Sequence, residues 1–250
     1  MASNQAVSEP VIPAELPWPA DEFIDRLRDE GAARYHDGHA FHERMHAGTL
    51  TRPELQAWVL NRYYYQTRIP IKDALILSKS DDPAFRRLWI HRLVDHDGSE
   101  PGTGGLAQWL KLAEAVGLNS DDVAACSHVL PGVRFACDAY VTLVRESPLV
   151  VAVASSLTEF FAPDLMSKRI EAWERHYPWV AAAGLGYFRT RVTRARNDSQ
   201  EAIGFVVAHA STRALQEACV GALIRKTEVL WHLLDCVERA TAEARAAKAP

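Results

Sequence analysis

The sequence predicts an all-α protein whose helices, about seven to ten in number, pack into one compact bundle. Apolar residues recur at helical spacing along most of the chain, and no stretch shows the alternating pattern of a convincing strand. Pro, Gly and Asp residues separate the helical stretches, so the connections are expected to be short. With 250 residues, of which 48% are hydrophobic, the chain is long enough to bury a substantial core.

We expect one domain between two polar ends. Residues 1–18 contain three prolines and little periodicity, which predicts a flexible N-terminal arm. The single all-α domain is predicted over residues 19–240. The Ala-, Lys- and Arg-rich residues 241–250 are predicted to form a polar C-terminal tail.

The first third of the chain carries clear signals for helix starts and stops. Asp21 is a candidate N-cap for the first helix. A short histidine-rich segment over residues 36–48 ends at a glycine. Thr51 supplies a hydroxyl cap for the next helix, and Pro53 stands in its first turn. Pro70 is expected to break or kink that helix.

The helical pattern continues to the C-terminal end. Asp82 and Pro83 open a helix that ends before Gly98. The segment 149–161 is apolar on nearly all sides, which predicts a central position. The other predicted helices span residues 106–116, 121–126, 133–145, 166–175, 186–196, 199–210 and 212–245.

The composition excludes several classes of partner. A net charge of −4 argues against nucleic acid or an anionic membrane surface. The longest apolar run, Leu149 to Ala154, is too short to span a bilayer, and the N-terminal residues lack the pattern of a signal peptide. The four cysteines show no CxxC and no framework spacing, so they are expected to be reduced. We therefore expect a soluble protein of the cytoplasm.

One histidine is well placed for proton transfer. His96 lies near the end of the helix that precedes Gly98, and it shares a helix face with Arg92, four residues earlier. The negative end of the helix dipole favours the histidine cation, and Asp95 and Asp97 flank it. We therefore predict a pKa for His96 near neutral pH and a role in proton transfer. The alternative is an ordinary solvated helix end.

A second histidine motif suggests a metal. His42-Glu43-Arg44-Met45-His46 matches H-E-x-x-H, in which two histidines bind zinc and the glutamate acts as base. The segment is short, however, and no third ligand is evident downstream. A chance match on a surface helix is therefore favoured, and a metal-dependent helical oxygenase or hydrolase stays as an alternative.

Cations in apolar helices predict a closed pocket for a multiply anionic small molecule. Glu159 lies in the apolar segment, where an unpaired carboxylate is costly, and Arg169 is a candidate partner. Lys226 lies among apolar residues of the last helix. Ordinary solvated helix faces are the alternative. The pairs that share a face at a spacing of four residues are Arg62 and Gln66, Arg92 and His96, and Tyr187 and Arg191.

Long, ordered blocks of the chain resemble a known enzyme family. From about Asp21 to Arg239, the sequence contains RYHDGHAFH, LNRYYYQTRIPIKDA, RRLWIHRLVDHDG, LPGVRFACDAY, SSLTEFFAP and GYFRTR. These blocks closely resemble the pyrroloquinoline-quinone synthase family, which has the haem-oxygenase-like, thiaminase-related fold. The resemblance therefore implies the same helical fold.

The resemblance also implies the chemistry. Family members are oxidases without a metal or flavin cofactor. They close the last ring of a tricarboxylate-like hexahydroquinoline precursor and oxidise it with dioxygen to pyrroloquinoline quinone (PQQ), releasing hydrogen peroxide. The resemblance further suggests a homodimer.

By similarity, a defined set of residues forms the site. His96 is implied as the general acid or base, Tyr187 and Arg191 flank the oxygen site, and His36 is a further catalytic candidate. The residues implied to bind substrate are Tyr35, Arg62, Gln66, Arg92, Tyr140, Glu159, Arg169 and Lys226.

One position departs from the family pattern. After SSLTEFFAP the family carries a histidine that lines the oxygen pocket, where this chain has Met166. A thioether cannot exchange a proton. Either His36 covers the missing role, or the later oxidation steps are impaired, or the chain is a paralogue that binds a quinone or its precursor with altered turnover. A methionine that only fills volume is the remaining reading.

Overall fold

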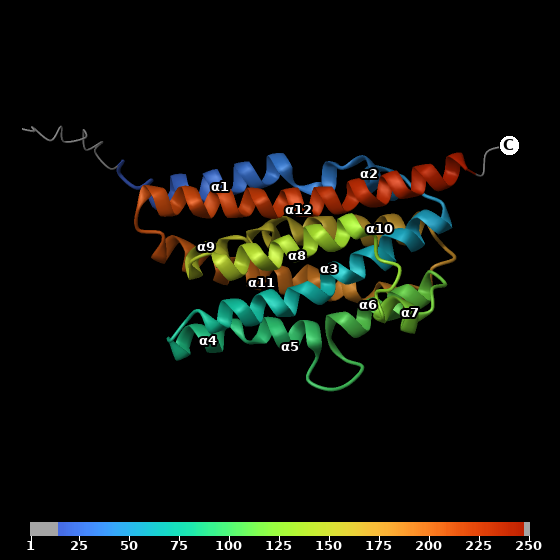
Figure 1. Ribbon diagram of the computed structural model, residues 1–250, viewed down its shortest axis with the longest axis horizontal. Coiled ribbons are helices and arrows are strands. Elements are labelled where there is room, and N and C mark those ends of the chain that lie inside the picture. Colours follow the sequence, from blue (N-terminus) through green and yellow to red (C-terminus); the bar gives the residue numbers. More distant parts are fainter. Residues whose placement is uncertain (1–14, 248–250) are drawn as a thin grey trace, which may run out of the picture.

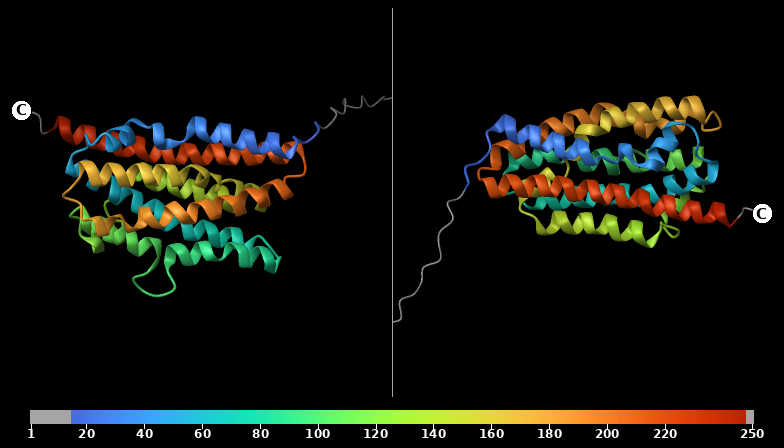
Figure 2. Two further views of the ribbon diagram at one scale, coloured as in Figure 1. Left: turned by 180° about the vertical axis from the view of Figure 1, so that it is seen from behind. Right: turned by 90° about the horizontal axis from the view of Figure 1, so that it is seen from above.

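The computed structural model describes residues 15–247, which form an all-α bundle without a strand in that range. Helices α1 (Ala20–Arg34) and α12 (Arg213–Ala246) run side by side along one edge (Figures 1 and 2). Helices α4 to α7 lie on the opposite side, and the remaining long helices lie between these layers. The predicted all-α class is confirmed.

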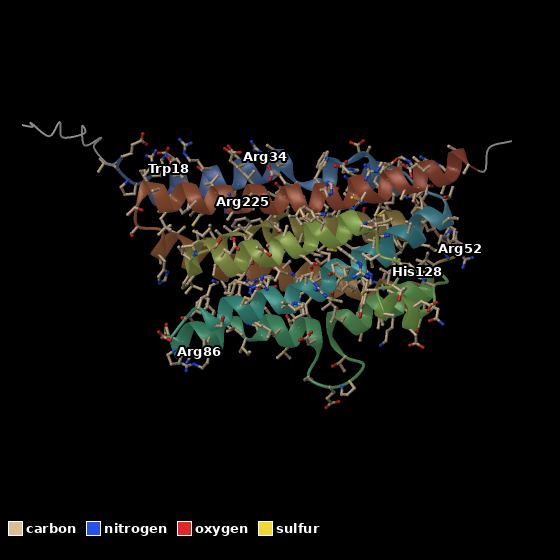
Figure 3. All side chains as sticks on the ribbon, viewed as in Figure 1. Trp18, Arg34, Arg52, Arg86, His128 and Arg225 are labelled. Carbon is tan, nitrogen blue, oxygen red and sulfur yellow. The ribbon has the colours of Figure 1, made fainter. Side chains whose placement is uncertain are left out.

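The N-terminal part of the domain is anchored on α12. The Trp18 backbone N–H donates to Gln216 Oε1 at 2.7 Å, and Gln216 Nε2 donates to the Trp18 carbonyl at 3.0 Å. Figure 3 shows Trp18 beside the start of α12. Trp18 was expected in the flexible arm, of which residues 1–14 lie outside the described residues. The α1 N-cap is Pro19 rather than Asp21, which instead lies in the first turn, where its charge suits the helix dipole.

The turn η1 (His36–Gly38) and helix α2 (Ala40–His46) lead to α3 (Arg52–Ser78). The capping box between Thr51 and Glu54 confirms the predicted start of α3. Pro70 does not break the helix, which continues through it.

The stretch that ends at Gly98 contains two helices, α4 (Pro83–Trp89) and α5 (His91–Asp97), where one was expected. Asp82 caps α4 as predicted, because its side chain accepts from the backbone N–H groups that follow. Gly98 ends α5 with a φ of 88°, a conformation that favours glycine.

Two predicted boundaries differ in the C-terminal half. The apolar segment 149–161 divides into α9 and η2, and the helices expected over 186–196 and 199–210 form one continuous α11. Helix α12 extends to Ala246, beyond the expected domain end at residue 240. The elements not yet named are α6 (Gly104–Ala115), α7 (Ser120–Ala124), α8 (Pro131–Glu146), α9 (Leu149–Ala154), η2 (Leu157–Phe161), α10 (Ala162–His176), η3 (Ala182–Leu185) and α11 (Gly186–His209).

The most apolar part of the chain lies in the core. The stretch Leu149–His176 is long and apolar enough to cross a membrane by length and composition, but most of its apolar window is buried inside the bundle. It contains Glu159 and Arg169, and it divides into α9, η2 and α10. The stretch is therefore the centre of a folded helical domain. The four cysteines carry no disulfide, as expected.

Candidate active site

A small polar cavity of about 60 Å³ lies where α3, α5, η2, α10, α11 and α12 meet. Seven of the predicted site residues and Met166 lie on its wall. The lining residues are Tyr35, His36, Arg62, Tyr65, Ile69, His96, Thr158, Glu159, Ala162, Met166, Tyr187, Arg191 and Leu230. The structure therefore brings together residues that lie almost 200 positions apart in the sequence.

His96 presents an unprotonated nitrogen at this wall. Its Nδ1 lies 3.2 Å from the Arg92 carbonyl oxygen, so Nδ1 carries the hydrogen and donates it. Nε2 is buried and has no partner among the described residues. Burial, helped by Arg191, lowers the pKa of His96 to about 3. The predicted near-neutral pKa is therefore wrong, because burial outweighs the helix dipole, and the neutral imidazole is a proton acceptor.

Glu159 is paired, but not with the predicted partner. Its carboxylate lies 2.7 Å from Arg92 Nη1 and 3.7 Å from Arg191 Nη2. Burial raises the pKa of Glu159, but Arg92, Lys72 and Arg191 outweigh burial and lower it to about 2. The predicted ion pair with Arg169 does not form, because Arg92 of α5 and Arg191 of α11 lie beside the carboxylate instead.

Asp198 completes this charged network, and the sequence analysis missed it. Its Oδ2 lies 3.1 Å from Arg191 Nη1, and its backbone carbonyl accepts a hydrogen bond from Arg92. Arg92 and Arg191 therefore already form ion pairs with acidic residues of the protein. Asp198 lies seven residues after Arg191 and so shares its helix face, which is the signal that would have indicated the pair.

The other three predicted cations have only neutral partners among the described residues. Arg169 contacts His42 Nε2 at 3.2 Å and Met166 Sδ at 4.0 Å. Lys226 donates to the Tyr65 hydroxyl at 2.6 Å, and Arg62 lies over the Tyr65 ring at 4.0 Å.

These cations also repel one another. Burial and then Arg62 lower the pKa of Arg169 to about 9, and the same two causes lower the pKa of Lys226 well below its ordinary value. A protein seldom buries charge in this way without a counter-charge. This arrangement suits a ligand that carries several negative charges.

The predicted tyrosines and glutamine lie around these charges. The Tyr187 hydroxyl donates to Gln66 Oε1 at 2.9 Å. Tyr35 packs edge-on against His36, with ring centroids 4.4 Å apart. Tyr140 lies behind the wall, where Lys226 Nζ is 3.7 Å from its ring centroid. It therefore supports the cation and does not line the cavity.

Met166 lies at the cavity wall, in the first turns of α10, with its side chain buried. Its sulfur contacts the Arg169 guanidinium, and His36 lines the same cavity. Met166 and His36, the residue predicted to cover the role of the missing histidine, therefore line the same cavity.

The H-E-x-x-H motif has the wrong geometry for a metal site. Glu43 is exposed, whereas His42 is buried and its Nε2 faces the cationic guanidinium of Arg169. A cation at that position disfavours a metal ion on the same nitrogen. This geometry therefore argues against a metal-dependent hydrolase or oxygenase built on this motif.

A different set of residues lies at metal-binding distances on the outer side of Asp198. His91, Asp198 and Glu201 present nitrogen and oxygen atoms within 4.8 Å of one another. Their contacts also form an ion-pair chain, because His91 Nε2 lies 3.2 Å from Asp198 Oδ1 and 3.6 Å from Glu201 Oε2. Since His91 is 40% exposed, this chain connects Arg191 to the surface.

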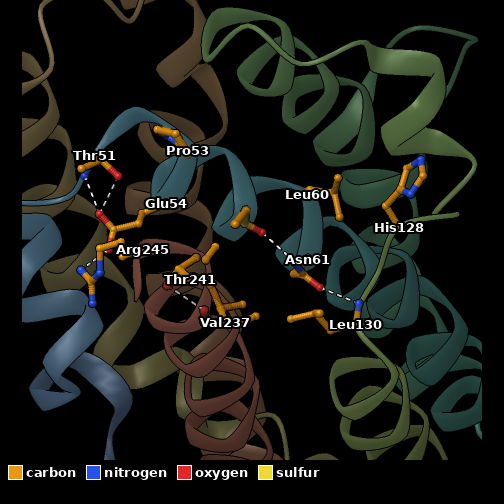
Figure 4. Close-up of a pocket in the computed structure, with 13 residues that line it drawn as sticks. Thr51, Pro53, Glu54, Leu60, Asn61, His128, Leu130, Val237, Thr241 and Arg245 are labelled. Carbon is orange, nitrogen blue, oxygen red and sulfur yellow. Dashed lines mark hydrogen bonds and ion pairs between the residues drawn. The ribbon is translucent and has the colours of Figure 1, made fainter. Parts of the chain in front are cut away.

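A much larger cavity lies elsewhere. A groove of about 590 Å³ lies between the start of α3, residues 128–130 and the end of α12 (Figure 4). It contains none of the predicted site residues. Its walls include Leu60, Leu130 and Val237, with Glu54 and Arg245 at one end.

Comparison with known proteins identifies the family. Residues 24–236 match the TENA/THI-4/PQQC family. The chain belongs to this family. A protein of Granulibacter bethesdensis named pyrroloquinoline-quinone synthase is 50% identical over 87% of the chain and 85% of its own length. A protein of the same name from Rhizobium rhizogenes is 49% identical over 88% of the chain and 89% of its own length.

The fold is shared more widely than the sequence. A crystal structure of a domain with a haem-oxygenase-like fold from Shewanella denitrificans superposes with a TM-score of 0.73 at 13% identity. The alignment covers 91% of this chain and 95% of that one. This likeness shows the fold alone and confirms the predicted haem-oxygenase-like architecture.

Proposed function

We propose that this family member is a pyrroloquinoline-quinone synthase, which closes the last ring of a tricarboxylate-like precursor and oxidises it to PQQ with dioxygen. The structural observation that carries the proposal is the group of three cations with neutral partners, of which Arg169 and Lys226 are buried and Arg62 is half-buried. Three cations match the charge of a tricarboxylate, and each carboxylate would gain charge-assisted hydrogen bonds. The names of the relatives support the same activity.

In the proposed reaction, His96 Nε2 removes protons from ring carbons of the bound precursor. The hydrogen bond from Nδ1 to the Arg92 carbonyl holds the imidazole in the required tautomer. Bound carboxylates would also raise the pKa of His96 from its low value, because they offset Arg191. The histidine can then hold the proton that it has taken.

The network of Arg191, Glu159 and Asp198 performs a different task. We assign the oxygen site to Tyr187 and Arg191, which lie on one face of α11. Dioxygen accepts two electrons and two protons for each molecule of hydrogen peroxide, and a fixed guanidinium stabilises the negative charge that develops. Asp198 and Glu159 hold that guanidinium in place.

The cavity must widen to admit this substrate. Pockets for organic ligands usually measure about 300–1,000 Å³, whereas this one measures about 60 Å³. The flexible side chains on its wall include Met166 and Arg62. We expect these to move when the tricarboxylate enters, because it supplies the counter-charges that separate the cations.

One experiment separates turnover from binding alone. Purified protein is mixed with the precursor in air, and the quinone absorbance and oxygen uptake are followed. Formation of quinone with oxygen consumption supports the proposal. Tight binding without either change would instead support the paralogue that binds a quinone without completing the oxidation.

We further propose that the reaction needs no metal and no organic cofactor. Dialysis against a strong chelator should leave the rate of quinone formation unchanged. Loss of activity that zinc or iron restores would contradict this proposal. His91, Asp198 and Glu201 would then be the first residues to replace.

We also propose a cytoplasmic homodimer. Phe135 on α8 is 76% exposed and borders a shallow apolar groove with Ala139 and Val229. Exposed apolar patches often mark interfaces between proteins. Light scattering should give the mass of a dimer, and Phe135→Asp should lower it to that of a monomer.

A further inference from the structure

The guanidinium of Arg169 is buried and has no acidic partner among the described residues. It is 2% exposed, and its Nε has no hydrogen-bond partner among the described residues. Besides the weakly accepting sulfur of Met166, two aromatic rings lie against the guanidinium, Trp58 at 4.9 Å and Phe188 at 5.4 Å. Aromatic faces attract a cation but do not fix the direction of its N–H groups.

His42 fixes the direction of one of these N–H groups. Its Nδ1 lies 2.9 Å from the His36 carbonyl oxygen, so Nδ1 carries the hydrogen and donates it. Nε2 then has a lone pair, which accepts a hydrogen bond from Arg169 Nη2 at 3.2 Å. Burial and Arg169 lower the pKa of His42 well below its ordinary value, which keeps the imidazole neutral and able to accept.

We infer that His42 is a positioning residue that orients Arg169 for a carboxylate of the ligand and ties it to the turn that carries His36. The same imidazole contacts two elements distant in sequence, η1 and α10. The first histidine of the H-E-x-x-H motif thus serves anion binding through Arg169. The inference depends on the proposed function only in its use of PQQ as the ligand.

Two substitutions at His42 separate its two hydrogen bonds. The amide nitrogen of asparagine lies near the position of Nδ1, so His42→Asn keeps the donor to the His36 carbonyl and removes the acceptor for Arg169. The amide group of glutamine reaches the position of Nε2, so His42→Gln keeps an acceptor there. His46→Gln, in the same helix, is the matched control, because neither nitrogen of His46 has a hydrogen-bond partner among the described residues.

The first measurement is PQQ affinity by calorimetry. His42→Asn should weaken binding roughly 10-fold, His42→Gln by less, and His46→Gln not at all. In a protein that already carries Arg169→Ala, His42→Asn should have no further effect, because His42 acts through Arg169. Independent, additive losses would overturn the inference, since they indicate only a structural role.

The second measurement does not depend on the ligand. In protein labelled with ¹⁵N-arginine, the Arg169 Nε–H signal is assigned by its loss in Arg169→Lys. His42→Asn should broaden that signal and speed its hydrogen exchange, whereas His46→Gln should not. An unchanged signal would refute the positioning role. If the natural protein fails to bind PQQ, the proposed function fails, and this spectrum still decides the role of His42.

Discussion

Two cavities of this protein contrast in size and in chemistry: the larger is mainly apolar, and the smaller is lined by several charged and polar side chains. The groove between α3 and α12 measures about 590 Å³ and is mainly apolar, whereas the cavity beside His96 measures about 60 Å³ and is lined by cations, tyrosines and histidines. The ion-pair cluster at the end of the groove, which joins Glu54 and Glu238 to Arg44 and Arg245, is internally balanced, and Glu54 also closes the α3 capping box. At or near the small cavity, by contrast, Arg62, Arg169 and Lys226 have only neutral partners among the described residues.

Buried charge without a counter-charge is therefore a better indicator of a functional site than the volume of a cavity. Burying a cation without a carboxylate destabilises the folded protein. Such a cost is tolerated where a ligand supplies the counter-charge. Empty apolar volume arises more easily, wherever two helices diverge.

The largest predicted effect concerns His96. His96→Ala should slow the first proton abstraction by about 10²–10⁴-fold and leave PQQ binding nearly intact, because in the proposed mechanism the histidine is the base and the cations bind the ligand. Single-turnover absorbance measurements give the rate, and calorimetry gives the affinity. A variant with a near-normal rate would remove His96 from the mechanism.

The next largest effect concerns Arg169, which is proposed to bind a carboxylate of the ligand. Arg169→Ala should weaken PQQ binding by about 1.5–3 kcal/mol, or roughly 10- to 150-fold, the range for a hydrogen bond to a charged group. The matched control is Arg86→Ala, exposed on α4 (Figure 3), which should leave affinity unchanged. Equal affinities for both variants would contradict the role of Arg169.

The next prediction concerns Met166, which places no hydrogen-bond donor at its position in the small cavity. A thioether cannot donate a hydrogen bond to the peroxide anion that forms during oxidation. The natural protein should therefore accumulate a partly oxidised intermediate, and Met166→His should speed its decay by about 10- to 10²-fold. Rapid-mixing spectra of both proteins decide the matter. If no intermediate forms and the variant is no faster, Met166 only fills space.

The burial of His96 also predicts a dependence of stability on pH. Its pKa of about 3 in the folded protein lies below the unfolded value of about 6.5, so the unfolded state binds more protons between these limits. Its contribution is complete above pH 6.5 and is lost as pH falls toward 3. Between pH 7 and pH 5, His96→Asn should therefore lose about 2 kcal/mol less stability than the natural protein. Urea unfolding at both pH values measures this; equal losses would indicate that His96 is solvated.

The smallest expected effect lies in the large groove. Ala244→Trp places an indole at the exposed end of that groove and should change neither PQQ affinity nor turnover, because no charged group of the site lies there. A loss of activity with normal thermal stability would show that the groove takes part in the reaction.

Local signals in the sequence predicted the helix ends well and the charge pairing poorly. Thr51, Asp82 and Gly98 end or begin helices as expected, since capping depends on residues within one turn. The partner of Glu159 was missed, because it depends on how α5 and α11 pack. The resemblance named the site residues, but it could not show which arginines already have acidic partners.

His96 shows the same limit on electrostatic reasoning. The helix dipole and the two flanking aspartates suggested a stabilised cation. Asp95, however, pairs with Arg194 at 2.8 Å, and the imidazole faces the interior. Desolvation then dominates, and its size depends on packing that a single helix does not reveal.

The pairing of α1 with α12 has a consequence for how the protein is made. The cavity needs Tyr35 and His36 from the start of the domain and Leu230 from its last helix, with Lys226 behind them. A ribosome adds roughly 5–20 residues per second, so the first of these side chains waits at least several seconds for the last. Until α12 arrives, α1 lacks its main packing partner and the cation cluster is incomplete. A nascent chain therefore cannot bind its ligand, and the site forms only when synthesis of the domain is finished.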